Sequence, residues 1–306
     1  MHKFLEKYLL IIAMITGITF HKQLYIFNPV IPYLLSLMLF ITYCRVTWNE
    51  VRLTNFHYIL LAIQYLGSAV VYILLKPFNE ILAQAVMICI LTATATSAPV
   101  VTGILGGNIA TVAAYSVLSN LLVAFMAPLF LSVIGSTNEH VPFFTSFWYI
   151  FQKVMPILLV PFVLALLLAK ISPKAHSKVR SAQIVSFYLW TIALTIVIGN
   201  VTQFVLTHND GNYSLELVIA GVTLVVCLMQ FIFGRKIGSH FNNTVAGGQS
   251  LGQKNTILAI WLTQTYLNPL ASLGPGLYVL WQNLVNSWQI WRKSKKDDLN
   301  KITEQA

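Results

Sequence analysis

Ten apolar stretches, each near the length of a membrane-crossing helix, constrain the fold of this chain more than any other feature. They lie at about residues 4–20, 27–44, 55–75, 79–106, 108–134, 145–170, 184–206, 214–233, 240–268 and 270–291. A helix needs roughly 17–25 residues to cross the hydrocarbon core of a bilayer. Charged residues are only 9% of the chain, against about 25% in soluble domains. We therefore expect an all-α integral membrane protein with ten transmembrane helices.

The distribution of basic residues predicts the orientation in the membrane. With the N-terminus in the cytoplasm, only Lys22, Lys76 and Lys153 of the 19 Lys and Arg residues fall in outer loops. Because cytoplasmic loops carry an excess of Lys and Arg, both termini are expected in the cytoplasm and the protein in the plasma (inner) membrane. The net charge of +10 is then a topology signal, and no nucleic-acid partner is expected. The first stretch is interpreted as a span because Glu6 interrupts the basic leader of a signal peptide.

Motifs of soluble and membrane enzymes are missing from the sequence. Cys44, Cys89 and Cys227 are scattered in apolar surroundings without the spacing of a disulfide framework or a metal site. The histidines have no ligand spacing, no two carboxylates share a span, and Gly-x-Ser-x-Gly does not occur. We expect neither an enzyme nor a cofactor.

Two of the spans carry residues that a continuous membrane helix avoids. In the fourth span, Pro99 lacks an N–H and disfavours helical angles at the residue before it. In the ninth, Gly247, Gly248 and Gly252 lie beside Lys254, and glycine tolerates a break in the helix. We expect both helices to be interrupted, although a simple proline kink with threonine hydroxyls bonded to the preceding turn is an alternative for the fourth.

The spacing of the two breaks predicts an internal repeat. The breaks, near 94–99 and 248–255, lie about five spans apart, and because five is odd the two units must have opposite orientations. We expect two inverted five-helix repeats, residues 1–135 and 140–291, followed by a basic cytoplasmic tail at 292–306. Discontinuous helices four and nine would then cross near the membrane midplane, which is typical of secondary transporters.

Polar residues in two other spans are candidates for contacts with the crossing. Gln64 places an amide in the middle of the third span, where a simple helix-to-helix hydrogen bond is the alternative role. The fifth span carries a polar face, which should point toward protein or water and away from lipid. This face consists of Thr111, Tyr115, Ser116, Ser119 and Asn120.

Four segments resemble the bile acid:sodium symporter family. They are Ala62–Tyr65, Thr96–Thr102 followed by Gly107–Asn108, Gly252–Ala259, and Pro275–Asn283. The likeness is good over about 55–130 and 240–290 and elsewhere extends only to the pattern of spans. It implies ten helices, a panel and a core domain, crossing discontinuous helices, and sodium-coupled uptake of organic anions.

The chain departs from this resemblance at the positions that bind sodium in the family. Ala98–Pro99 stands where the family has a Ser-Asn pair, and Val112 where it has a serine, with a hydroxyl kept at Ser116. The glutamate that serves both sodium sites aligns with Ser250, and the glutamine of the second site aligns with Lys254.

The remaining polar residues suggest that both sodium sites are dismantled. Only Gln64 is kept from the second site, and the ammonium of Lys254 would repel a sodium ion. We expect Lys254 to supply the positive charge that a bound ion would otherwise bring. The alternative is one weakened sodium site formed by Gln64, Ser116, Ser250 and backbone carbonyls.

Lys254 has no carboxylate at midplane depth, because every Asp and Glu lies in a loop, a tail or at the end of a span. A lone ammonium there costs roughly 2.5–3.5 kcal/mol. Three compensations are open: carbonyls at the ends of the half-helices, loss of the proton on burial, or an anionic substrate. The resemblance places the substrate near Lys254 together with Thr94, Thr96, Asn255, Thr256 and Gln282, each of which could instead bond its own broken backbone.

The expected function is secondary transport of a small organic anion, independent of sodium and either proton-linked or facilitative. A sodium-coupled symporter and a non-transporting membrane receptor of the same fold are the alternatives. The expected partners are the organic anion and the lipid bilayer. Bile acids, keto acids, pantoate-like acids and sulfonates all remain open as substrates, as do the direction and stoichiometry of transport and the oligomeric state.

Overall fold

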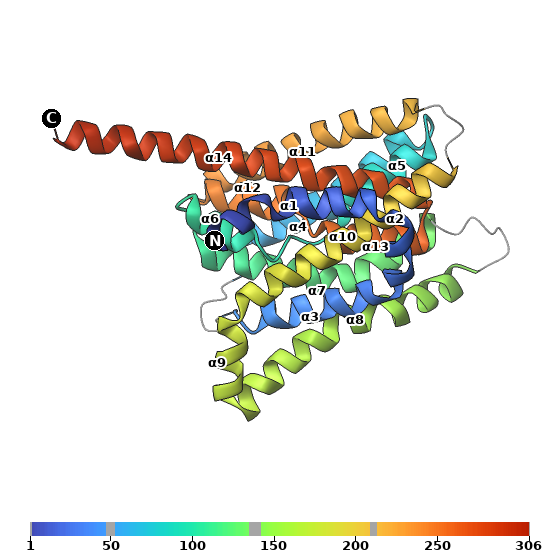
Figure 1. Cartoon of the computed structure of the whole chain (residues 1–306), viewed down its shortest axis with the longest axis horizontal. Helices are drawn as coiled ribbons and strands as arrows, with labels where there is room; N and C mark the ends of the chain where they lie inside the picture. Colours follow the sequence, from blue (N-terminus) through green and yellow to red (C-terminus); the bar gives the residue numbers. More distant parts are fainter. Residues whose placement is uncertain (1, 47–52, 135–141, 209–212, 306) are drawn as a thin grey trace.

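The protein is helical throughout the regular structure of this computed structural model, which describes residues 2–46, 53–134, 142–208 and 213–305 (Figure 1). The predicted boundary between the two halves, at 135–140, lies outside these residues. The first half contains α1 (His2–Thr19), α2 (His21–Leu24), η1 (Tyr25–Val30), α3 (Ile31–Tyr43), α4 (Asn55–Leu75), α5 (Glu80–Leu91), α6 (Ala98–Ile104) and α7 (Ile109–Ile134). The second contains α8 (Phe143–Ile171), α9 (Pro173–Ser181), α10 (Gln183–His208), α11 (Ser214–His240), α12 (Thr244–Gly252), α13 (Thr256–Tyr266), η3 (Pro269–Ser272) and α14 (Leu273–Gln305).

Six helical segments of the described chain are long and apolar enough to cross a membrane. They are His21–Tyr43, Asn55–Leu75, Ile109–Ile134, Phe143–Ile171, Ile184–Thr207 and Ser214–His240. They coincide with the predicted second, third, fifth, sixth, seventh and eighth spans. The prediction of a multi-pass integral membrane protein is therefore confirmed.

The helical structure extends beyond the predicted last span. α14 continues from Leu273 to Gln305, so the last span and the basic tail form one helix. After Gly276, its sequence contains no Gly or Pro that would end the helix.

Both predicted interruptions are present, but the residues that make them differ from the prediction. The first break covers residues 92–97, between α5 and α6. Pro99 lies in the first turn of α6. Backbone N–H groups in the first turn have no partner within the helix, so the missing N–H of proline costs no hydrogen bond there. The proline therefore starts the second half-helix and does not end the first. The second break is shorter and covers residues 253–255, between α12 and α13.

The glycines predicted to break the ninth span instead allow two helices to approach closely. Gly247 and Gly248 lie inside α12, which packs along α11. A Cβ atom at Gly247 would overlap the carbonyl oxygen of Gly234 on α11, and a Cβ at Gly234 would overlap the carbonyl of Gly247. Small residues at such contacts are typical of helix packing in membranes. These glycines hold α12 against α11.

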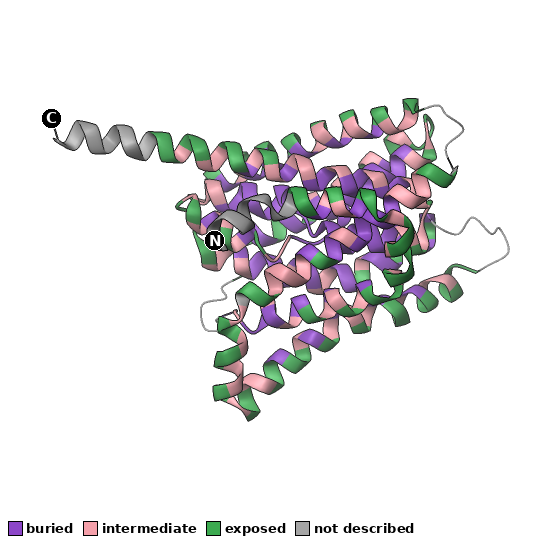
Figure 2. Cartoon of the chain, viewed as in Figure 1, coloured by how far each residue is buried: buried purple, intermediate pink, exposed green. Residues whose placement is uncertain are grey.

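The half-helices lie inside the bundle with the continuous helices around them. α5 and α6 lie toward opposite ends of the bundle, as do α13 and α12 (Figure 1). α10 packs against both α1 and α3, and α3 packs against α8. α4, α11 and α14 each pack against α5. Burial is greatest around the two interruptions and falls toward the outer helices (Figure 2).

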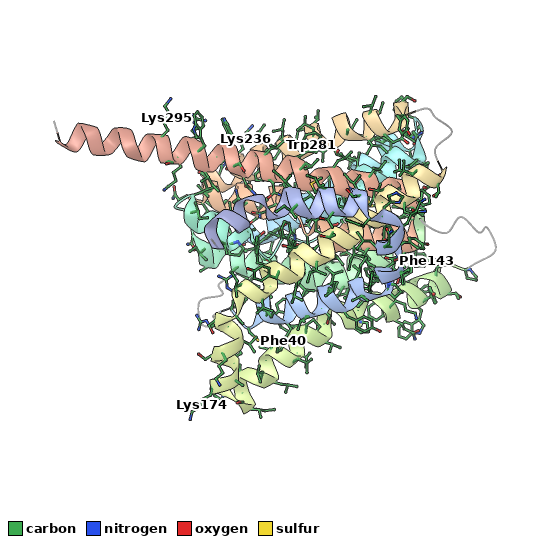
Figure 3. All side chains as sticks on the ribbon, in the orientation of Figure 1. Phe40, Phe143, Lys174, Lys236, Trp281 and Lys295 are labelled. Atoms are coloured by element: carbon green, nitrogen blue, oxygen red, sulfur yellow. The ribbon has the colours of Figure 1, made fainter. Side chains whose placement is uncertain are left out.

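The start of α1 and the end of α14 lie at the same end of the bundle (Figure 1). Lys174, Lys236 and Lys295 lie toward that end, and Phe143 lies at the other (Figure 3). This arrangement is consistent with the orientation that the basic residues predict.

Candidate functional site

The extended segments that interrupt the two helices pair with each other at the centre of the molecule. Thr94 and Lys254 form an antiparallel bridge. The N–H of Ala95 donates to the carbonyl of Gln253 at 2.9 Å, and the N–H of Asn255 donates to the carbonyl of Ala93 at 2.8 Å. In a bilayer, backbone groups freed by a broken helix must find partners within the protein. Here each broken helix supplies partners for the other.

Lys254 holds the end of the opposite half-helix. Its side chain is 1% exposed, and its Nζ donates to the carbonyl oxygens of Ile90 at 2.8 Å and Thr92 at 3.2 Å. These carbonyls belong to the C-terminal end of α5, where the helix dipole favours a cation. Within the described residues, no carboxylate pairs with the amine. Three ways of compensating the buried amine were predicted, and the contacts show the first, which is bonding to carbonyls at the end of a half-helix.

Gln64 holds the same helix end from the other side. Its Nε2 donates to the carbonyls of Leu91 at 2.8 Å and Thr92 at 3.2 Å. Its Oε1 accepts from the Tyr115 hydroxyl at 2.7 Å and from Ser119 at 3.3 Å. The amide predicted in the middle of the third span thus contacts the first interruption directly, and it shares the Thr92 carbonyl with Lys254.

The polar face of α7 converges on Thr94. The Thr94 N–H donates to Ser119 Oγ at 3.3 Å, and its carbonyl accepts from Ser116 at 3.4 Å and Asn120 at 3.3 Å. Its hydroxyl donates to the Ser250 carbonyl at 2.6 Å. Thr94 therefore satisfies the backbone of both interrupted helices, and its side chain is fully buried.

Gln282 and Asn255 complete the crossing from the C-terminal half. Gln282 Oε1 accepts from the N–H of Lys254 at 2.8 Å. Asn255 caps α13, its Oδ1 accepting from the N–H of Leu258 at 3.2 Å, and Thr256 begins that helix. Their observed contacts are with the backbone at the second interruption.

The sequence analysis missed a second glutamine and tyrosine pair. Gln230 Nε2 donates to the Tyr278 hydroxyl at 2.9 Å and to the carbonyl of Cys89 at 3.3 Å. The Tyr278 hydroxyl donates to the carbonyl of Gly252, at the end of α12, at 2.8 Å. The available signal was the same as for Gln64, a buried amide within an apolar span.

A cavity of about 290 Å³ lies beside the crossing, between α3 and the α6–α7 pair. Among its walls are Thr96 and Ser116, both predicted site residues, and Tyr43 and Arg45, which were not predicted. Thr94, Lys254, Ser250 and Gln282 do not line it. Of the predicted residues, Thr96 and Ser116 line the cavity, and Ser116 is buried and also contacts Thr94 at the crossing.

Arg45 gives the cavity a positive charge. It follows the end of α3 and is half-buried. Burial, and then the positive charge of Arg180, lower the pKa of Arg45, but an arginine remains protonated in proteins.

Several buried oxygen atoms around the crossing make no hydrogen bond within the described chain. They include Ser250 Oγ, Asn120 Oδ1 and Gln253 Oε1. Buried oxygens in native proteins usually find a partner in protein or water. These atoms are therefore candidates to contact a ligand or water when the protein changes conformation.

Comparison with known families identifies the protein family of the chain. The Sodium Bile acid symporter family matches residues 13–209, well over half of the chain. The chain belongs to this family. It is accordingly a secondary transporter for a small solute in the membrane, and not an enzyme. A comparison with curated proteins gives no match. The match ends before α11, so the family likeness of the segment around Lys254 stays a prediction.

The Tyr115 hydroxyl is expected to stabilise the first interruption. Tyr115→Phe removes the donor to Gln64 Oε1 and should cost about 1 kcal/mol of folding free energy. Thermal melts of the purified protein in detergent measure the effect. Tyr65→Phe is the matched control, because the Tyr65 hydroxyl is buried and makes no hydrogen bond among the described residues; it should be neutral or slightly stabilising. Equal losses for the two variants would contradict the assignment.

Proposed function

We propose that the protein transports a small organic anion without sodium, and that Lys254 replaces the coupling cation. The observation that supports this most directly is the buried Lys254 ammonium bonded to two backbone carbonyls at a helix end. Carbonyl oxygens at interrupted helices are the groups that hold coupling ions in secondary transporters. Here an ammonium takes that role, and it cannot leave the protein.

Electrostatics disfavours a sodium ion beside Lys254. Two unit positive charges about 4 Å apart repel by about 4 kcal/mol at an effective dielectric constant of 20. By the family resemblance, Ser250 stands where a glutamate would provide the neutralising charge. Its side chain is fully buried and brings no charge. The repulsion is therefore not offset.

The cavity beside the crossing is the proposed substrate site. Arg45 can bind a carboxylate or sulfonate through two parallel N–H donors, and Thr96 and Ser116 offer hydroxyls at the crossing side of the same cavity. In this conformation Lys254 is paired with Thr94 and does not line the cavity. The charge of Lys254 would then act on the substrate through the paired segments. The crossing would have to rearrange before the substrate could directly contact the other predicted residues, which are Thr94, Lys254, Asn255, Thr256 and Gln282.

An inverted repeat of residues 1–135 and 140–291 is part of this proposal. Gln64 pairs with a tyrosine of α7 in the first half, and Gln230 with a tyrosine of α14 in the second. In each unit, one member of the pair donates to the last carbonyl of the first half-helix of that unit, Gln64 to Leu91 and Tyr278 to Gly252. This correspondence supports alternating access around crossing helices. The distribution of the basic residues supports the remaining part of the proposal, which is that both termini lie in the cytoplasm and the protein in the inner membrane.

A sodium-coupled symporter is the second candidate. The Ser250 Oγ and Asn120 Oδ1 atoms, which are buried without a hydrogen bond in the described chain, favour it, because both residues contact Thr94 at the crossing. In that case a residual site formed by Gln64, Ser116, Ser250 and carbonyls would bind sodium while Lys254 serves as a structural cap.

Replacement of sodium separates the two candidates. Carboxylates and sulfonates that raise the melting temperature of the purified protein identify a substrate, since a ligand of the folded state stabilises it. Uptake of that compound into proteoliposomes is then measured with choline in place of sodium. We expect the same rate in both salts. Strict loss of uptake in choline would establish the sodium-coupled alternative.

Lys254 is expected to determine the pH dependence of transport. Lys254→Gln keeps a hydrogen-bond donor for the Ile90 and Thr92 carbonyls but removes the titrating charge. The variant should lose or sharply change the pH profile of uptake, measured from pH 5 to 9 in the same proteoliposomes. Lys174→Gln, on an exposed side chain of α9, is the matched control. An unchanged profile in Lys254→Gln would mean that the lysine is only scaffold.

Arg45 is expected to contribute to substrate affinity. Arg45→Ala should raise the KM at least about tenfold, since a hydrogen bond to a charged group contributes roughly 1.5–3 kcal/mol. Arg45→Lys should recover part of this, because it keeps the charge but loses the paired donors. Lys178→Ala removes an exposed charge of α9 and should leave KM unchanged. A KM unaffected by Arg45→Ala would exclude the cavity as the substrate site.

A further inference from the structure

A second and larger hollow lies on another face of the protein, between α11 and α14. Its volume is about 1050 Å³, at the upper end of the roughly 300–1,000 Å³ of small-molecule pockets. Val245 of α12 and Leu105, at the end of α6, lie behind it. It shares no lining residue with the cavity that contains Arg45. We call it the α11–α14 groove.

The length of the groove matches one leaflet of a bilayer. Its wall on α11 runs from Leu224 to Arg235, and its wall on α14 from Trp281 to Lys293. Each wall covers three helical turns, or about 16 Å at a rise of 1.5 Å per residue. Half of a hydrocarbon core is about 15 Å thick. Trp281 lies nearer the middle of the molecule, and Lys295 lies beyond the groove toward the end of α14 (Figure 3).

The polarity of the groove is divided along its length. Leu224, Leu228 and Leu284 line the part nearer the middle of the molecule. Arg235, Gln289, Arg292 and Lys293 line the other end, and no Asp or Glu is among the lining residues. A molecule that fits must therefore combine an apolar portion with an anionic end.

Contacts within the groove hold two of these cations in place. The Arg235 Nη1 donates to Gln289 Oε1 at 3.0 Å, which joins α11 to α14. The Arg292 guanidinium lies over the Trp288 ring, 5.4 Å from its centroid. Both guanidinium groups retain further N–H donors for an anion.

The apolar wall opens outward, where lipid surrounds a membrane protein. Ile232 and Leu284 are each 60% exposed and Trp288 is 53% exposed. A small water-soluble anion would leave this apolar surface uncovered. An acyl chain would cover it, and tryptophan beside basic residues is typical of the membrane interface.

We propose that the α11–α14 groove binds an anionic phospholipid of the inner leaflet. Its phosphate lies among Arg235, Arg292 and Lys293, and one acyl chain lies along Leu228 and Leu284. Basic pockets between membrane helices on the cytoplasmic side suit such headgroups. The lipid bridges α11, which packs against α12, and α14. It therefore stabilises the elements that carry the second interruption.

Native mass spectrometry of the purified full-length protein tests the proposal, with phosphatidylglycerol and phosphatidylcholine as probes. The wild type should bind phosphatidylglycerol more tightly. Arg235→Ala with Arg292→Ala should weaken that binding roughly 30-fold, from the attraction that two basic residues contribute near an anionic membrane surface. Lys236→Ala with Lys295→Ala is the matched control, because it removes the same charge from the same two helices outside the groove. It should bind phosphatidylglycerol as the wild type does.

Four results would overturn the proposal. The first three are equal binding of the two lipids by the wild type, an equal loss of binding in the control variant, and displacement of the lipid by millimolar inorganic phosphate. The last is a double variant that still binds the lipid but has a changed oligomeric mass. The last would make the groove an interface between copies. Thermal melts without lipid report whether the double variant folds. If the double variant melts at a lower temperature than the wild type, Arg292→Ala alone is used, since that side chain is exposed. We expect roughly a fivefold loss of phosphatidylglycerol affinity for this variant. No loss of affinity would equally overturn the proposal.

Discussion

The need to satisfy backbone groups where a helix is broken inside hydrocarbon underlies the whole arrangement. An interrupted helix exposes carbonyls at the end of one half and N–H groups at the start of the next, and lipid offers them no partner. The two interruptions solve this jointly by pairing around Thr94 and Lys254. Gln64 and Lys254 then hold the last carbonyls of α5. The polar residues of the surrounding spans supply hydrogen-bond partners for the backbone groups that the broken helices leave free.

This requirement also explains how one residue can be structural and functional at once. The Lys254 amine satisfies carbonyls that would otherwise be unpaired, and it introduces a positive charge without a carboxylate among the described residues. In a sodium-coupled transporter the same carbonyl environment would bind and release an ion. Binding of an ion from solution makes the stability of the crossing depend on ion concentration. A covalently attached ammonium removes that dependence.

Much of the framework could be predicted from the sequence because hydrophobic length and helix-breaking residues act locally. Six of the ten predicted spans and the two interruptions follow from such signals, and the interruptions were placed to within a few residues. The role of Gly247 could not be read locally, since it depends on the approach of Gly234 from another helix. Arg45 was interpreted only as a topology signal because nothing in its neighbourhood along the chain shows that α7 lies opposite. For Gly247 and Arg45, the contact that decides the role comes from a segment distant in sequence, and no local signal reveals it.

A fixed internal cation changes the energetics of transport. An inside-negative potential of 100 mV opposes the entry of one negative charge by about 2.3 kcal/mol, and co-transported sodium normally offsets this cost. In the proposed mechanism Lys254 replaces the coupling cation, and because it stays attached to the protein it transfers no net charge across the membrane in a complete transport cycle. Net uptake of an anion then requires that a proton accompany it, or that its concentration outside exceed that inside by roughly 50-fold at this potential. Without either, the proposed carrier would move the anion outward, so the anion gradient, the membrane potential and any accompanying proton would together set the direction of transport.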